Sequence, residues 1–187
     1  MTDLLPQAYL LGLIALLGVA AVVVGRQILR VRRDELALAR LGGNDKDSGG
    51  SRDASTLYEL ASVQLRKRLY VEAQGNLKQA LKLADAENAP AEARALMENA
   101  LGFTLAAQNN YSAAVRHYRA ALRAKADYPV ALNNLAFALE KQSKADEARS
   151  LYEKVLQLEA TNRTALKRLS ILERRSGRQA GESGKAS

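Results

Sequence analysis

The chain has 187 residues and a formal net charge of +8, because its 28 lysines and arginines outnumber its 20 aspartates and glutamates. With 3 prolines, no tryptophan and no cysteine, the composition favours an all-helical protein and excludes disulfide frameworks, zinc–thiolate clusters and thiol catalysis. His117 is the single histidine, so we expect no multi-histidine metal site, no catalytic residue, no cofactor and no enzyme.

The positive charge is placed at the two flanks of the chain. Residues 54–162 carry 14 basic and 12 acidic side chains and are nearly neutral, whereas residues 26–41 and 163–187 are basic. A nucleic-acid-binding domain usually has a basic face of its own. The distribution fits an anionic lipid surface better, so we expect no nucleic-acid partner. RNA binding through the basic tail is the least favoured function.

Residues 4–25 predict a transmembrane helix. No charged side chain occurs from Ala8 to Gly25, a stretch of about 27 Å as a helix, and starting at Leu4 extends it to about 33 Å. The hydrocarbon core of a bilayer is about 30 Å thick, so this length suffices for one crossing. Basic side chains follow directly: Arg26, Arg30, Arg32 and Arg33. The positive-inside rule then places the N-terminus outside and the rest of the chain in the cytoplasm.

A cleaved signal peptide is the competing interpretation of this segment. Such peptides begin with basic residues and have an apolar stretch of about 7–15 residues. Here the arginines come after a longer apolar stretch, so we favour an uncleaved anchor. A buried core helix is disfavoured, because the rest of the chain can form its own core.

Two further segments follow the anchor. Residues 26–41 predict a basic juxtamembrane helix, and the sequence leaves open whether this helix lies on the lipid headgroups or stands away from the membrane. Residues 42–53 are rich in glycine, serine and charged side chains, which cannot bury a core, so they predict a flexible linker. The linker glycines precede no apolar strand and predict no phosphate-binding loop.

The rest of the chain is self-similar at a period of 34 residues. The pattern that begins at Leu101 recurs at Leu135, and the pattern that begins at Ala114 recurs at Ala148. An earlier copy begins at Leu57. This is the spacing of the tetratricopeptide repeat, in which each copy holds two antiparallel helices, A and B. An ordinary alanine-rich helical bundle is the alternative, but three copies at this spacing favour the repeat.

We therefore predict an all-α fold: an α-solenoid of three tetratricopeptide repeats with a C-terminal capping helix, preceded by one transmembrane helix. The predicted repeats cover residues 54–162 in three copies, 54–87, 95–128 and 129–162. Residues 163–175 predict the basic capping helix and residues 176–187 a disordered tail. Seven extra residues separate the first two copies, and Pro90 among them favours a loop followed by a restarted helix.

The A helices of such an array line its inner surface. Positions spaced i, i+4 and i+7 on each A helix form a stripe that does not face helix B. The first two positions of each stripe give the candidate partner-binding residues: Tyr58, Ser62, Asn99, Phe103, Asn133 and Phe137. An asparagine can both donate to and accept from a peptide backbone, and a phenylalanine can anchor an apolar side chain. The alternative, that both phenylalanines fill gaps between repeats, stays open, and we slightly favour groove exposure.

Two other functions of this surface are disfavoured. A groove that clamps a terminal carboxylate, as in Hsp90-type adaptors, needs polar or basic side chains where Ser62, Ala106 and Ala107 occur. His117 has no second ligand at metal-binding spacing, so it predicts a partly exposed structural histidine.

The whole pattern, up to about residue 175, resembles the photosystem I assembly factors of cyanobacteria and plastids. The stretches that carry the resemblance are Leu69–Gln74, Lys78–Leu83, Ala100–Phe103 and Ala131–Ala136, together with the single span, the three repeats and the basic cap. The chain departs from the repeat pattern by lacking aromatic residues at 105 and 139 and prolines at 126 and 160.

The resemblance implies a scaffold in the thylakoid membrane, single-pass, with its repeat domain on the cytoplasmic side. Its partners would be photosystem I subunits or assembly factors, and it would have no catalytic residue and no cofactor. The alternative function is a membrane-tethered adaptor for another bacterial complex-biogenesis pathway, such as cytochrome maturation or envelope assembly.

Overall fold

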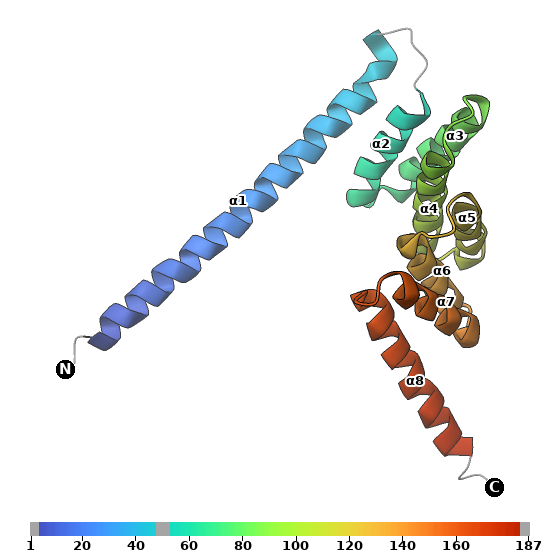
Figure 1. Cartoon of the computed structure of the whole chain (residues 1–187). Coiled ribbons are helices and arrows are strands. Elements are labelled where there is room, and N and C mark those ends of the chain that lie inside the picture. Colours follow the sequence, from blue (N-terminus) through green and yellow to red (C-terminus); the bar gives the residue numbers. More distant parts are fainter. Residues whose placement is uncertain (1–3, 48–52, 184–187) are drawn as a thin grey trace. The chain divides into compact units, whose positions relative to one another are not determined.

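The computed structural model describes residues 4–47 and 53–183, and this part of the chain is helical with no strand. Its helices are shown in Figure 1: α1 (Leu4–Asp47), α2 (Ala54–Arg66), α3 (Tyr70–Ala86), α4 (Ala91–Ala107), α5 (Tyr111–Ala124), α6 (Pro129–Lys141), α7 (Ala145–Leu158) and α8 (Arg163–Ser183). The chain divides into two compact units, Met1–Gly50 with α1 and Ser51–Ser187 with the remaining helices. The predicted all-α class is confirmed.

Helix α1 is one unbroken helix of 44 residues. It joins the predicted transmembrane and juxtamembrane segments and continues through residues 42–47, where the sequence predicts a linker. Propagation adds one hydrogen bond for each residue fixed, and a glycine costs only about 1 kcal/mol relative to alanine, so two glycines do not stop an established helix. Residues 48–52 of the predicted linker lie outside the described residues. By length and composition α1 can cross a membrane.

The second unit is built from three helix pairs and a capping helix. Helices α2 and α3, α4 and α5, and α6 and α7 pack as hairpins, while α3 packs on α4, α5 on α6 and α7 on α8. Pro90 is the N-cap of α4, so the extra residues contain the predicted loop and restarted helix. They also lengthen α3 and α4 to 17 residues each, whereas the other repeat helices have 13 or 14.

Small side chains bring the two helices of each pair together. Ala73, Ala114 and Ala148 are fully buried on the B helices. In the second pair the ring of Tyr118 packs directly on Gly102, where an added Cβ would lie 2.7 Å from a ring carbon. The close approach of α4 and α5 therefore depends on a residue without a side chain.

The turns repeat as the helices do. A residue in the left-handed conformation follows each A helix of the three pairs, at Arg68, Asn109 and Ser143. Helix α2 is capped by Asp53, whose carboxylate accepts a 2.8 Å hydrogen bond from the Thr56 backbone N–H. This bond holds the pKa of Asp53 below its usual range.

Helix α8 closes the array at its C-terminal end. Ala165 and Leu172 are buried against the third repeat, which is the arrangement expected of a capping helix. The helix continues to Ser183, eight residues into the predicted tail. The Ser176 hydroxyl donates to the Glu173 carbonyl oxygen, and the Arg149 guanidinium of α7 donates to that hydroxyl at 3.5 Å. Residues 184–187 lie outside the described residues.

Candidate partner-binding face

We call the six predicted partner-binding residues the A-helix stripe: Tyr58, Ser62, Asn99, Phe103, Asn133 and Phe137. Five of them are half-buried, and Phe103 is exposed. The structure does not bring them into one cluster. They belong to three local environments, one on each A helix, and each environment has its own contacts.

The stripe residues of the first repeat are involved in local packing. Tyr58 packs against the buried core of the second unit. The Ser62 hydroxyl donates a 2.8 Å hydrogen bond to the Tyr58 carbonyl oxygen one turn earlier. The hydroxyl of Ser62 is therefore already bonded within α2.

Asn99 joins the second repeat to the third. Its Nδ2 donates to the Tyr128 hydroxyl at 3.4 Å, and its Oδ1 accepts from Asn134 Nδ2 at 3.0 Å. Tyr128 is the N-cap of α6, and its partial burial raises the pKa of its hydroxyl. We call the group Asn99, Tyr128 and Asn134 the middle joint.

Asn133 makes the equivalent contact one repeat later. Its Nδ2 donates to Asn162 Oδ1 at 3.3 Å, and the same oxygen accepts from the Ala165 N–H at 3.1 Å, which caps α8. Asn133 Oδ1 is buried and has no hydrogen-bond partner among the described residues. We call Asn133, Asn162 and Arg168, the residues 34 positions after those of the middle joint, the end joint.

The two phenylalanines occupy different environments. Phe103 is 45% exposed on α4. Phe137 contacts the ring of Tyr111 edge-on, with the ring centroids 6.5 Å apart, and lies beneath two cations. Arg168 is 4.6 Å and Lys141 5.4 Å from its ring centroid. Phe137 therefore packs between the third repeat and its neighbours, and Phe103 presents an apolar ring at the surface.

A buried carboxylate supports the packing of Phe137. The Glu140 side chain is 5% exposed and accepts a 2.6 Å hydrogen bond from the Tyr152 hydroxyl. Its other oxygen lies 3.7 Å from the Arg168 guanidinium. Burial, followed by this hydrogen bond, raises the pKa of Tyr152. The third repeat and α8 thus share one chain of contacts, from Tyr152 through Glu140 and Arg168 to Phe137.

The sequence analysis missed the residues that complete the joints. Tyr128 and Asn162 are 34 residues apart, and each lies directly before the next A helix. The period that located the repeats would have located this pair also. Arg168 carried no such signal, because its counterpart in the middle joint is the uncharged Asn134.

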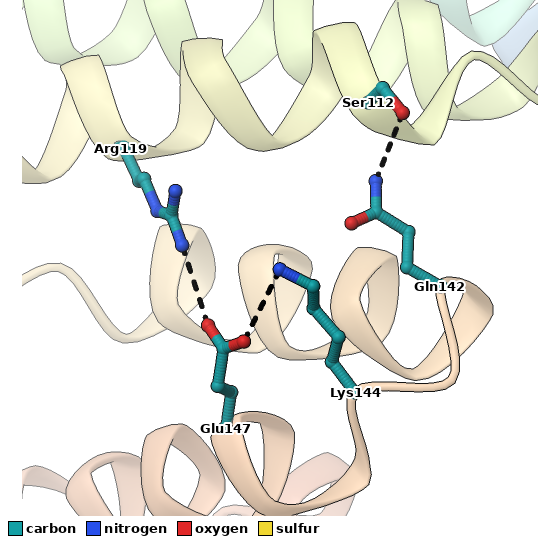
Figure 2. Close-up of polar contacts among 5 residues, drawn as sticks. All are labelled: Ser112, Arg119, Gln142, Lys144 and Glu147. Atoms are coloured by element: carbon teal, nitrogen blue, oxygen red, sulfur yellow. Dashed lines mark hydrogen bonds and ion pairs between the residues drawn. The ribbon is translucent and has the colours of Figure 1, made fainter.

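A second set of missed residues links the second repeat to the third (Figure 2). Arg119 of α5 lies 3.4 Å from Glu147 of α7, which also pairs with Lys144 at 3.3 Å. Gln142, the C-cap of α6, donates to the Ser112 hydroxyl of α5 at 3.3 Å. These contacts are exposed, so each contributes little stability, and together they set how one repeat stacks on the next.

The same corner of the preceding repeat carries an equivalent bond. Gln108, which lies 34 residues before Gln142, donates to Gln74 Oε1 at 3.0 Å. Gln74 itself lies 34 residues before Gln108. A glutamine at each of these positions is therefore part of the repeat, and its spacing could have been found in the sequence.

The other singled-out residues lie apart from the stripe. Arg26, Arg30, Arg32 and Arg33 are exposed on α1. His117 Nδ1 lies 2.7 Å from Glu98 Oε2, so the single histidine joins α5 to α4. Among the described residues no three His, Cys, Asp or Glu side chains are grouped so that they could hold a metal ion.

Comparison with solved structures supports this fold. The first tetratricopeptide domain of RPAP3 bound to an HSP90 peptide matches 68% of the chain and 96% of that domain, with a TM-score of 0.61 and 20% identity. The Cut9–Hcn1 structure of the APC/C matches 79% of the chain and 28% of that chain, with a TM-score of 0.70 and 18% identity. These likenesses show the fold, and the predicted repeat architecture is confirmed.

Sequence comparison shows the family. A tetratricopeptide repeat model matches residues 99–125 and 130–160. A ycf37 protein of Guillardia theta is 30% identical over 172 residues, which are 92% of this chain and 94% of that protein. The chloroplastic tetratricopeptide repeat domain-containing protein PYG7 of Arabidopsis thaliana is 33% identical over 90% of this chain, which spans about half (54%) of the PYG7 length. The chain belongs to the ycf37 family of tetratricopeptide-repeat proteins.

Proposed function

We propose that this chain is a membrane-anchored scaffold that holds photosystem I subunits or assembly factors during photosystem I assembly. The tetratricopeptide fold is that of a protein-interaction scaffold and is generally non-enzymatic. The match to a plastid-type ycf37 protein over 94% of its length carries the more specific proposal. It agrees with the chloroplastic location in the name of the Arabidopsis relative.

The exposed part of α4 offers the contact surface. Phe103 and Leu96 lie seven residues apart on one face of the helix and are 45% and 42% exposed. Exposed apolar side chains on a rigid helix face can anchor a partner, since removing them from water contributes about 25 cal/mol for each Å² buried. Phe103 is therefore the stripe residue on which partner binding depends most.

The proposed location is the thylakoid membrane, with the repeat domain on the cytoplasmic side. The length and apolar composition of α1 support a single crossing. The four exposed arginines that follow residue 25 support the orientation. Adding protease to sealed thylakoid vesicles whose cytoplasmic face is outward tests it. Residues 54–183 should be digested without detergent, and their protection would place them in the lumen.

Co-purification tests the scaffold function. The tagged full chain, isolated from detergent-solubilised thylakoids, should retain photosystem I subunits or assembly factors. The double variant Leu96→Ala with Phe103→Ala should lose most of this recovery. A matched control, Val71→Ala with Leu158→Ala, removes two exposed apolar side chains from B helices and should retain it. Equal recovery by both variants would show that the α4 surface is not the contact.

Deleting the gene tests the process itself. We expect accumulated photosystem I to fall while photosystem II stays largely intact, and the wild-type chain to restore photosystem I. Unchanged photosystem I in the deletion strain would contradict the proposal. If the tagged chain then co-purified with another assembly complex, the adaptor function in a different biogenesis pathway would replace it.

A further inference from the structure

The A-helix stripe continues beyond the third repeat. The positions that lie 34 residues after those of α6 are on α8, where they carry Lys167, Ile171 and Arg174. A hollow of about 550 Å³ opens at this place and is lined by Arg163, Thr164, Lys167, Arg168 and Ile171. We call these five residues the basic hollow. It lies at the N-terminal half of the capping helix, outside the predicted binding residues.

The cations of the basic hollow differ in what they already contact. Arg168 is occupied, because its guanidinium lies over the Phe137 ring and 3.7 Å from the Glu140 carboxylate. Arg163 and Lys167 have no ion-pair partner among the described residues, and both are exposed. Two positive charges therefore remain without compensation beside the apolar side chain of Ile171.

The rest of the stripe carries no comparable charge. The stripe positions on α2 and α4 are uncharged, and the acidic one on α6, Glu140, is paired with Arg168 and Tyr152. The unpaired charge along the stripe is thus positive and is confined to its α8 end. An extended partner that follows the stripe would meet polar and apolar side chains first and cations last.

We propose that the basic hollow binds carboxylate side chains of an acidic segment in the protein partner. Arginine can hold a carboxylate through two parallel hydrogen bonds, and Lys167 adds a point charge beside it. The continuity of the hollow with the stripe favours a protein segment over a lipid headgroup. This inference rests on the proposed scaffold function and states the charge of the segment that the scaffold holds.

Peptide binding to the full chain in non-ionic detergent tests the inference. The probe is a fluorescein-labelled peptide of alternating glutamate and alanine, and its counterpart has glutamine in place of glutamate. Fluorescence anisotropy should show about tenfold tighter binding of the glutamate peptide. That preference should weaken as salt rises from about 0.05 to about 0.3 M, because exposed charges are screened.

Charge reversal locates the site. Arg163→Glu with Lys167→Glu should weaken binding of the glutamate peptide by about tenfold or more. The control Arg116→Glu with Lys154→Glu makes the same change in net charge on exposed positions of α5 and α7 and should change it by less than about threefold. Circular dichroism should show equal helicity for both variants. Equal weakening by both variants, or no preference of the wild type for glutamate, overturns the proposal.

Two further measurements separate the alternatives. The full chain in phosphatidylcholine nanodiscs is mixed with phosphatidylglycerol vesicles. If the Arg163/Lys167 variant loses vesicle binding and keeps peptide binding, the ligand is a lipid headgroup and the proposal is overturned. Co-purification of photosystem I proteins is measured on the same variant. If the wild type recovers them but does not prefer the glutamate peptide, the scaffold function stands and only this inference fails.

Discussion

The middle joint and the end joint are the same construction made with different residues. Asn99, Tyr128 and Asn134 of the middle joint correspond, 34 residues later, to Asn133, Asn162 and Arg168 of the end joint. In the middle joint Asn134 donates to Asn99 Oδ1. In the end joint Arg168 turns to the Phe137 ring and the Glu140 carboxylate, and Asn133 Oδ1 has no partner among the described residues.

One substitution within the period therefore changes the surroundings of several others. An unsatisfied buried acceptor costs about 1–3 kcal/mol, and a cation over an aromatic ring contributes about 0.5–2 kcal/mol. Arg168 exchanges one for the other and covers Phe137 as it does so. Phe103 has the uncharged Asn134 where Phe137 has this arginine and stays exposed. A repeated position thus takes its role from the helix that follows it.

The largest expected difference is between the two phenylalanines. Phe137→Ala should lower the free energy of unfolding by about 2 kcal/mol, since a half-buried ring loses part of the 3–5 kcal/mol typical of a buried one. Phe103→Ala should change it by less than about 0.5 kcal/mol. Urea unfolding of the full chain in detergent, followed by circular dichroism, measures both. Equal losses would show that the two rings are equally packed.

Arg168→Asn places the middle-joint residue in the end joint. We expect a loss of about 1–2 kcal/mol, because Glu140 stays buried without its cation while the new amide can donate to Asn133 Oδ1. The double variant Arg168→Asn with Glu140→Ala also places the counterpart of Ala106 and should recover part of this loss. Urea unfolding of both variants provides the comparison. A double variant less stable than Arg168→Asn alone would contradict the role given to Glu140.

The buried tyrosines provide a smaller contrast. Tyr152→Phe removes a hydrogen bond to a carboxylate and should cost about 1.5 kcal/mol. Tyr118→Phe should cost less than about 0.5 kcal/mol, because the Tyr118 hydroxyl has no hydrogen-bond partner among the described residues. Thermal unfolding of the two variants side by side measures the difference. A greater loss at Tyr118 would reverse the assignment of the polar contact to the end of the array.

The smallest expected difference is between the two asparagines. Asn99→Ala leaves both the Tyr128 hydroxyl and the Asn134 amide without their partner and should cost about 1 kcal/mol. Asn133→Ala breaks one bond but also removes the unpaired oxygen, so about 0.5 kcal/mol is expected. Each value comes from the urea midpoint at an unchanged slope. If Asn133→Ala proved the more damaging, its oxygen would have a partner in solution.

The period of the sequence predicted the architecture, and local chemistry decided the rest. The recurrence of Leu101 at Leu135 was enough to predict stacked helix pairs, because burial repeats with the period. The same period made Phe103 and Phe137 equivalent, and nothing within the repeats distinguishes them. The difference comes from Arg168, on a helix outside the repeats, and contacts between elements far apart in the chain cannot be read from spacing alone.

The unbroken course of α1 determines a reach as well as an attachment. Its 44 residues measure about 66 Å, which is about twice the thickness of a hydrocarbon core. With residues 4–25 in the bilayer, a straight rod of about 33 Å would project into the aqueous phase and act as an outrigger for the cargo-holding part of the chain. Its span corresponds to the height of a small domain, so removing two turns would bring the cargo about 11 Å closer to the lipid.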